Sequence, residues 1–293
     1  METERRCMQL DMFGKKRYKV NLHTHTTLSD GRKIPEEVIE LYRAKGYDAV
    51  ALTDHWYYGK GYDANGLTVL SGAEYNSITG DCRDGVYHIV GIGMNYEPSL
   101  TVSASPQKII DEIHRAGGLA ILAHPAWSLN TLEQILPLEN VDATEIYNTV
   151  SGVHNSRRPD SSLIIDLLAS NGRFYPLVAD DDAHFYDNDN CVSWIMVEAN
   201  DNSSKELCDA IRKGNFYATQ GPEIHLCREK DNFLVQCSPC QKITFYSNSV
   251  SLRTFWGDGL TEARYELPPD VCFIRAEATD QNGNSAWSNI IPV

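Results

Sequence analysis

Two short runs in this chain place metal-ligating side chains two residues apart. They are His23-Thr-His25 and Asp182-Ala-His184, and each follows a short apolar segment typical of a β-strand. At the end of a strand, residues i and i+2 point to the same side, so both side chains of a run can reach one cation. The spacing therefore predicts metal binding by segments that lie far apart in the sequence.

Four single candidates follow other expected strands. They are His55, Glu74, His88 and His124. A lone histidine is more often a hydrogen-bonded or surface residue than a ligand, and we interpret His114, His154 and His225 in that way. For the remaining six histidines, that interpretation requires six independent coincidences at strand ends. Mixed imidazole and carboxylate ligands favour Zn, Mn or Fe over Mg or Ca.

The elements that must position these residues alternate along the chain. Apolar runs predict strands at 18–23, 48–53, 67–73, 87–92, 119–123, 142–147, 175–179 and 193–198. Helical patterns with Pro, Ser or Gly at their ends predict helices at 35–45, 106–116, 162–170 and 204–213. This alternation predicts an α/β fold with a parallel sheet closed into a barrel, whose active site forms at the carboxyl ends of the strands.

The chain divides into three parts by composition. Residues 1–17 are a charged lead-in, and residues 18–220 carry the alternating pattern and every candidate ligand. Residues 221–293 hold short β-like runs with turn signals such as Asp258-Gly259, which predict a small all-β domain, sandwich-like. Because all candidate ligands precede residue 185, we expect the metal-binding part to survive removal of 221–293.

Composition narrows the functional class. The 293 residues carry a formal charge of −14, which disfavours a broad surface for duplex nucleic acid but not a small phosphorylated substrate. No apolar run reaches the roughly 20 residues that a membrane span needs. The charged N-terminus has no secretory pattern, so we expect a cytoplasmic protein with reduced cysteines.

The motifs, in their order, resemble those of the PHP family (polymerase and histidinol phosphatase domain). The matching segments are HisThrHisThrThrLeuSerAspGly at 23–31, ThrAspHis at 53–55, GlyAlaGlu at 72–74, His88, AlaHisPro at 123–125, Glu145 and AspAlaHis at 182–184. The resemblance implies a distorted (β/α)7 barrel, and the sequence near 276–289 looks like the C-terminal β domain of two-domain members. It also implies a metal-dependent phosphoesterase.

The same resemblance implies two or three divalent metal ions and assigns their ligands. His23, His25, Glu74 and Asp182 would hold the first metal, and Glu74, with His88 and His124, would hold the second as a bridging ligand. Asp30, His55 and His184 would hold the third. Members that act on histidinol phosphate place a histidine where this chain has Asp30, so the carboxylate argues against that substrate.

The expected reaction is hydrolysis of a small phosphate ester, a phosphomonoester or a nucleotide-like phosphodiester, by a metal-activated water. His55, Glu74, Asp182 and His184 are the candidate catalytic residues. A phosphate also needs fixed cations, and the candidates are Arg83, Arg157 and Arg158. Two alternatives stay open: a metal-dependent amidohydrolase and a non-catalytic metal-containing binding protein. The sequence does not indicate an oligomeric state.

Overall fold

The structure is a computed structural model that describes residues 10–78, 86–230, 232–250 and 253–293. Its strands as far as residue 219 are β1 (Arg17–Asn21), β2 (Ala49–Ala51), β3 (Tyr62–Ala64), β4 (Leu67–Leu70), β5 (Gly72–Ile78), β6 (Val86–Ile92), β7 (Leu119–Leu122), β8 (Ala143–Asn148), β9 (Leu177–Asp180), β10 (Trp194–Glu198) and β11 (Phe216–Thr219). The helices are α1 (Pro35–Ala44), α2 (Pro106–Arg115), α3 (Leu132–Ile135), α4 (Thr149–Val153), α5 (Ser162–Ser170) and α6 (Ser204–Arg212). Beyond residue 220 come β12 (Ile224–Glu229), β13 (Asn232–Tyr246), β14 (Thr254–Glu266), β15 (Phe273–Thr279), β16 (Ser285–Trp287) and β17 (Ile291–Pro292).

The longer helices form where the sequence predicts them, and α2 shows why. The Ser105 hydroxyl accepts a hydrogen bond from the Lys108 backbone N–H (3.3 Å), and Pro106 occupies the first turn, where its missing N–H costs nothing. Ile109 and Ile113 lie on one buried face of the helix. Gly117, with a φ of 84°, follows its end. Local capping and apolar spacing therefore determine this element.

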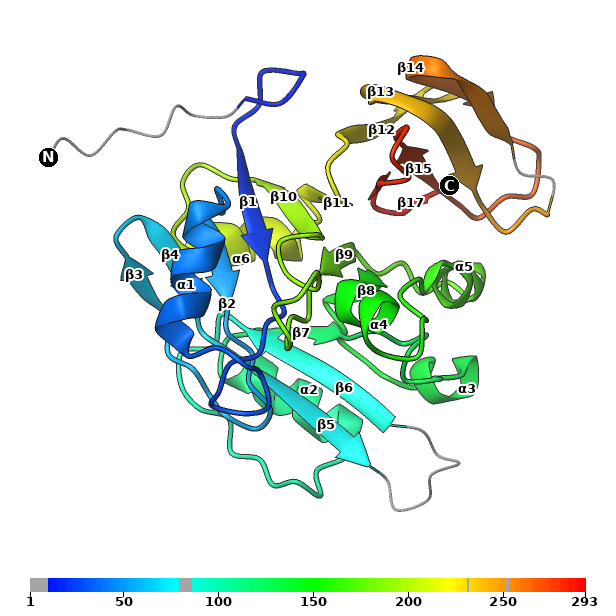
Figure 1. Cartoon of the computed structure of the whole chain (residues 1–293). Helices are drawn as coiled ribbons and strands as arrows, with labels where there is room; N and C mark the ends of the chain where they lie inside the picture. Colours follow the sequence, from blue (N-terminus) through cyan, green and yellow to red (C-terminus); the bar gives the residue numbers. More distant parts are fainter. Residues whose placement is uncertain (1–9, 79–85, 231, 251–252) are drawn as a thin grey trace, which may run out of the picture.

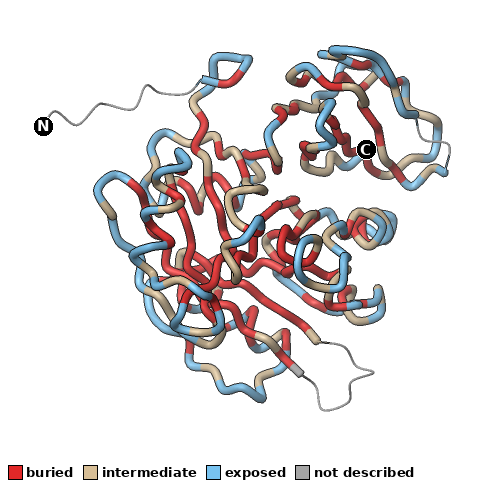
Figure 2. Tube along the Cα trace, viewed as in Figure 1, coloured by how far each residue is buried: buried red, intermediate tan, exposed pale blue. Residues whose placement is uncertain are grey.

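The strands form two sheets (Figure 1). One sheet has the order β5-β6-β7-β8-β9, and the other runs β12-β13-β15-β16-β11-β10-β1-β2-β4-β3. Single bridges connect the sheets: Thr24, after β1, pairs with Ala183, after β9, and His55, after β2, pairs with Glu74 near the start of β5. The buried residues follow the strands where the sheets approach each other (Figure 2). Thus the ends of β1, β2 and β9 and the start of β5 converge.

A closed (β/α)7 barrel is not confirmed, whereas the broader expectation of a mixed α/β fold is. Both sheets are open among the described residues, and two of the six described helices have only five and four residues. Strands β5, β6 and β7 pair antiparallel, as do β1, β10 and β11. An apolar run predicts a strand but carries no information on its direction, so the expected all-parallel arrangement is wrong for these strands.

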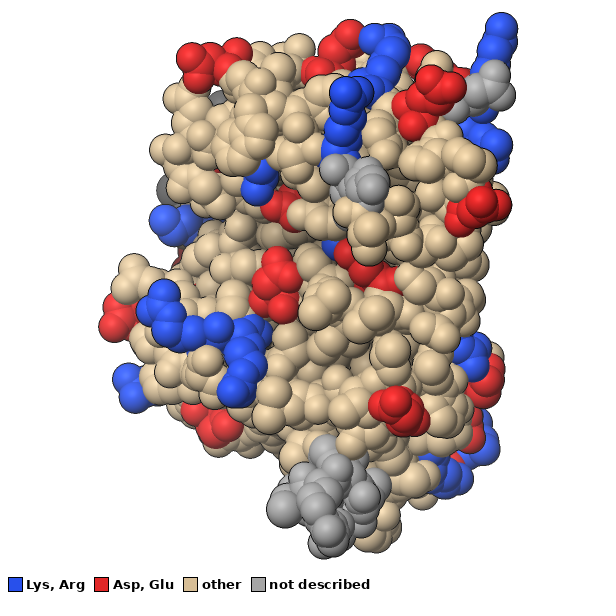
Figure 3. All heavy atoms as spheres, turned by 90° about the vertical axis from the view of Figure 1, so that its right-hand side faces the viewer, with Lys and Arg blue, Asp and Glu red and all other residues tan. Residues whose placement is uncertain are grey.

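The described part of 221–293 contains strands only, as the sequence predicts. β16 pairs antiparallel with β11 through Ala218–Trp287 and Thr219–Ala286, so one sheet continues across the expected domain boundary. On the face shown in Figure 3, acidic and basic side chains are interspersed. None of the helices in the described ranges combines the length and the apolar character that crossing a bilayer requires.

Candidate metal centre

The centre begins with His23 and His25, which follow β1 and are fully buried. Two backbone hydrogen bonds connect their segment to the one after β9: His25 N–H donates to the Ala183 carbonyl (3.0 Å), and Asp182 N–H donates to the His23 carbonyl (2.9 Å). The two runs that the sequence singles out are therefore neighbours. Asp182 adopts a φ of 51°, a left-handed conformation that is uncommon for residues other than glycine and is often found at functional sites.

The first group of ligand atoms is compact. Nε2 of His23 lies 3.2 Å from Glu74 Oε2 and 3.1 Å from Asp182 Oδ1, and Nε2 of His25 lies 3.0 Å and 3.1 Å from the same two oxygens. Both Nε2 atoms and Asp182 Oδ1 are buried and have no hydrogen-bond partner. Buried polar atoms are nearly always satisfied, so facing atoms without partners fit a bound cation. These four residues form one set able to hold a metal ion.

Glu74 connects this group to a second one. Its Oε1 lies 2.6 Å from His88 Nδ1 and 3.4 Å from His124 Nε2, while its Oε2 faces His23 and His25. Its two oxygens thus face different imidazoles, as a bridging carboxylate requires. Burial alone would raise the pKa of Glu74, but the facing imidazoles, His23 and His88 foremost, lower it well below its usual value. The carboxylate is therefore ionised and able to bind cations.

A third group lies at the more open side. Nε2 of His184 is 3.3 Å from Asp30 Oδ1, and Nε2 of His55 is 3.8 Å from Asp30 Oδ2. Together with His25, these residues form another set able to hold a metal ion. The Asp30 side chain is 58% exposed, in contrast to the buried ligands of the first group. A hydrogen bond from His184 is the main cause that lowers the pKa of Asp30.

Glu145 positions two of the histidines. Its Oε1 accepts a hydrogen bond from His23 Nδ1 (2.7 Å), and its Oε2 accepts from the His124 backbone N–H and from Asn148 Nδ2 (both 2.8 Å). Because Nδ1 of His23 donates, the lone pair of Nε2 faces the ligand cluster. Asn148 also donates to Asp182 Oδ2 (3.2 Å). Glu145, which the sequence motif includes, therefore orients the metal-ligand candidate His23 through a hydrogen bond on the side away from the cluster.

Buried acids that are not candidate ligands support the loops that carry the ligands. Asp54 accepts hydrogen bonds from the Thr26 backbone N–H (2.7 Å) and the Ser29 hydroxyl (2.7 Å), which shapes the segment leading to Asp30. Asp181 accepts from three backbone N–H groups at residues 191–193. Sequence reasoning did not assign a role to Asp54, although its place beside His55 is a usable signal.

A cavity of about 310 Å³ opens over the cluster. Its walls include Trp127, whose ring lies edge-on to His124 (4.9 Å between centroids), and Phe185, which follows His184. Arg157 and Arg158 are exposed and do not line the cavity, and Arg83 lies outside the described residues. Sequence reasoning missed Arg32, an exposed residue that does not itself line the cavity but whose guanidinium stacks over the Phe185 ring at 4.5 Å.

Comparisons with known proteins address the fold. No protein-family model matches the chain. An uncharacterized protein of Methanocaldococcus jannaschii is 27% identical over 149 residues, covering 44% of this chain and 81% of its own. A Bacteroides vulgatus structure, described as a two-domain protein containing a predicted PHP-like metal-dependent phosphoesterase, superposes over 100% of this chain and 99% of its own, with 15% identity and a TM-score of 0.57.

An amidohydrolase structure from Chromobacterium violaceum covers 58% of this chain and 89% of its own, with 17% identity and a TM-score of 0.44. The agreement with the Bacteroides protein extends over the full length of the chain, so this chain has a PHP-like fold. The resemblance carried by the motifs is thereby confirmed at the level of the fold, C-terminal strands included.

Proposed function

We propose that this protein hydrolyses a small phosphate ester, a phosphomonoester or a nucleotide-like phosphodiester, with the aid of two or three divalent metal ions. The observation that carries the proposal is Glu74, a buried carboxylate whose two oxygens face separate groups of imidazoles. A carboxylate in that position suits a site with at least two neighbouring cations. Residues 18–220 would form the hydrolase part, and residues 221–293 the β domain.

The residues present fit such ions. Mixed imidazole and carboxylate donors suit Zn, Mn or Fe, and several buried donor atoms have no other partner. His23, His25, Glu74 and Asp182 would hold the first ion. Glu74, His88 and His124 would hold the second, and Asp30, His55 and His184 the third. When bound, the ions would supply an activated water and neutralise charge on the phosphoryl oxygens.

The chain's own groups account for orientation and proton transfer. Glu145 holds the His23 ring in one tautomer, so that Nε2 faces the centre. The side chains of His55 and His184 are 25% and 16% exposed and line the cavity, so, in protein whose third site holds no ion, either imidazole can reach the leaving oxygen of an ester bound there. A neutral leaving alcohol needs a proton, and an imidazole is a suitable donor near neutral pH.

The test is hydrolysis of a substrate panel by Mn, Zn and Fe forms. The panel contains aryl phosphate, mononucleotides, cyclic nucleotides, sugar phosphates, histidinol phosphate, and amide and carboxylic ester controls. We expect turnover of phosphate esters, highest with manganese because Asp30 adds a hard oxygen ligand, and little turnover of histidinol phosphate. The variants His25→Ala and Asp182→Asn should abolish the turnover of phosphate esters. His114→Ala is the matched control, because His114 pairs with Asp142 (3.0 Å) away from the cluster.

Turnover of amides or carboxylic esters in place of phosphate esters would favour the amidohydrolase alternative. Full metal occupancy without turnover of any substrate would favour a binding protein. Comparable losses in His114→Ala and His25→Ala would contradict the assignment of the ligands.

A further inference from the structure

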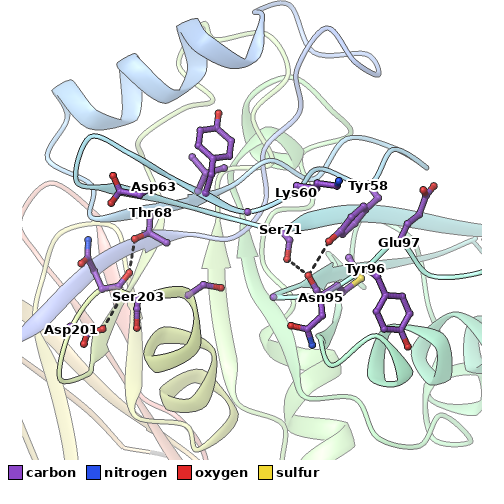
Figure 4. A pocket seen from close by; sticks show the side chains of 17 residues that line it. Tyr58, Lys60, Asp63, Thr68, Ser71, Asn95, Tyr96, Glu97, Asp201 and Ser203 are labelled. Carbon is purple, nitrogen blue, oxygen red and sulfur yellow. Dashed lines mark hydrogen bonds between the residues drawn. The ribbon is translucent and has the colours of Figure 1, made fainter.

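A second cavity, a groove of about 900 Å³, lies apart from the metal cluster and shares no lining residue with the cavity over it. Its walls come from the β3–β4 hairpin, the segment 58–61, the segment 93–97 that follows β6, and residues 201–204 where α6 begins. Figure 4 shows its labelled side chains at two ends, with Ser71 between them. The groove is therefore a distinct surface that the proposed hydrolysis does not use.

Three tyrosines line the groove, and backbone carbonyls hold the hydroxyls of two of them. The Tyr58 hydroxyl donates to the Met94 carbonyl (3.0 Å), and the Tyr96 hydroxyl donates to the Arg115 carbonyl (2.6 Å). Because these hydroxyls are engaged by backbone, the rings are held in place and present their apolar faces. Tyr62 and Tyr96 are each 52% exposed. Exposed aromatic rings held in one orientation are typical of binding sites.

The polar groups of the groove include both donors and acceptors. Lys60 and Glu97 lie beside Tyr58 and Tyr96 at one end (Figure 4), and neither makes a hydrogen bond or ion pair within the described part of the chain. Asp63 and Asp201 lie at the other end, and each has one oxygen engaged by a local backbone N–H. A ligand in the groove therefore meets a free ammonium group and several carboxylate oxygens.

This combination selects among ligand classes. Three carboxylates against one lysine disfavour a phosphate or other anion, and the ammonium group of Lys60 beside Tyr58 disfavours a cation at that end of the groove. The charged rim disfavours an apolar ligand. A neutral, polyhydroxylated molecule satisfies every group, because hydroxyls donate to carboxylates, accept from an ammonium group, and leave C–H faces to pack on tyrosine rings. We propose that the groove binds a neutral carbohydrate.

The test uses the full-length protein, an array of immobilised neutral oligosaccharides, and calorimetric titration of the strongest sugar in solution. We expect saturable binding in the millimolar range or tighter. Tyr96→Ala removes an aromatic surface and Glu97→Gln removes an anionic acceptor, and each should weaken binding by about tenfold. Tyr57→Ala is the matched control, because Tyr57 is 46% exposed but does not line the groove.

Each variant should have the thermal unfolding midpoint of the wild type, which shows that a loss of binding is not a loss of fold. The proposal is overturned if no neutral sugar binds, or if binding survives both groove variants. It is also overturned if spermine or a nucleotide binds in the same titration and its binding is weakened by Tyr96→Ala and Glu97→Gln as the sugar's binding is expected to be. None of these results bears on phosphate ester hydrolysis, since the groove contains no candidate ligand.

Discussion

At the scale of single residues, the centre depends on a few buried carboxylates that receive hydrogen bonds from imidazoles or face them directly. Five histidines lie within 3.4 Å of the Glu74 carboxylate, and Glu145 accepts a hydrogen bond from Nδ1 of one of them, His23. Burial would weaken each charge, but the imidazoles compensate, as the raised pKa of His23 and the lowered pKa of Glu74 indicate. The cluster is therefore a balanced set of charges in which each ligand depends on its neighbours.

Glu145→Ala should weaken metal binding without removing a ligand. The change leaves His23 Nδ1 without its acceptor, so the ring can rotate or take the other tautomer. Loss of such an orienting partner typically costs about 10- to 100-fold in metal affinity. The measurement is metal content after dialysis against a competing chelator. Glu139→Ala, which removes an exposed carboxylate paired with Arg173, is the control and should match wild type.

The pH dependence follows from His184. Burial lowers its pKa, but Asp182 and Asp30 raise it more, to about 9 in the metal-free protein. The unfolded value is about 6.5, so the stability this group contributes is complete below that pH and is lost as pH rises toward about 9. Metal binding needs the neutral imidazole, so metal affinity should instead increase over the same interval.

Thermal unfolding of metal-free and metal-loaded protein between these pH values tests both signs. The Tm of the metal-free protein should fall as pH rises, and the difference in Tm between the metal-loaded and metal-free forms should increase. His184→Gln should flatten the metal-free trend. A metal-free Tm that rises across this interval would contradict the charge state assigned to His184.

Arg32→Ala tests which cation holds the substrate. Arg32 and Arg157 are both exposed and neither lines the cavity, but Arg32 stacks on the ring of Phe185, which does line it. A charge-assisted hydrogen bond from Arg32 to an anionic substrate would be worth about 1.5–3 kcal/mol, so its loss should raise KM by about tenfold or more. We expect kcat to change little and Arg157→Ala to match wild type. The reverse pattern would restore the phosphate clamp expected from the sequence.

At the scale of elements, the centre depends on turns that deliver the ligands. Gly31 follows Asp30, and its N–H donates to the Thr26 carbonyl (2.9 Å). A Cβ at this position would lie 2.4 Å from the His25 carbonyl oxygen, so the turn tolerates only glycine. The turn thus fixes Asp30 relative to His25, and a larger residue must displace one of them.

Gly31→Ala should therefore lower occupancy of the third metal site and reduce turnover, while the first site stays filled. A calorimetric titration with metal separates the sites by their affinities, because the ligands of the third group are more exposed than those of the first. Gly59→Ala is the control, since a Cβ there would meet the Leu52 carbonyl oxygen at an ordinary 3.5 Å. Equal effects of the two substitutions would argue against a special role for the turn.

The elements also show how far sequence reasoning reaches. Helix α5 over Ser162–Ser170 has the bounds predicted, because apolar spacing is a pattern that acts within a few residues. The ligand runs are likewise local patterns, and the structure gathers all of them. Strand direction and sheet order depend on contacts far apart in the chain, so the antiparallel β5–β6 pair was not foreseen. Neither was the position of Arg32, which depends on the packing of Phe185.

At the scale of the whole molecule, the C-terminal strands are joined to the metal-binding part. β11 pairs with β16, and the Trp287 ring stacks on Tyr147 of β8 at 5.4 Å. Arg275, fully buried, makes two hydrogen bonds to Asp166 of α5 (2.6 and 2.7 Å). Tyr147 lies in the same strand as Glu145, which orients His23. Composition marks a boundary near residue 221, but it cannot reveal that one sheet crosses it.

Trp287→Ala should destabilise the whole protein and not the C-terminal strands alone. Trp287 is 2% exposed within the core shared with β1 and β9, and truncating a buried Trp typically costs about 3–5 kcal/mol. We expect a single unfolding transition with a lower midpoint, together with weaker metal binding.

Removal of 221–293 would expose β11 as an unpaired, apolar edge, so the shared sheet predicts aggregation where composition alone predicts a stable barrel. Trp256→Ala is the control, because Trp256 is 70% exposed on β14 and should leave the midpoint unchanged. Two separate transitions, or a truncated protein that stays monomeric and retains metal, would show that the two parts fold independently despite the shared sheet.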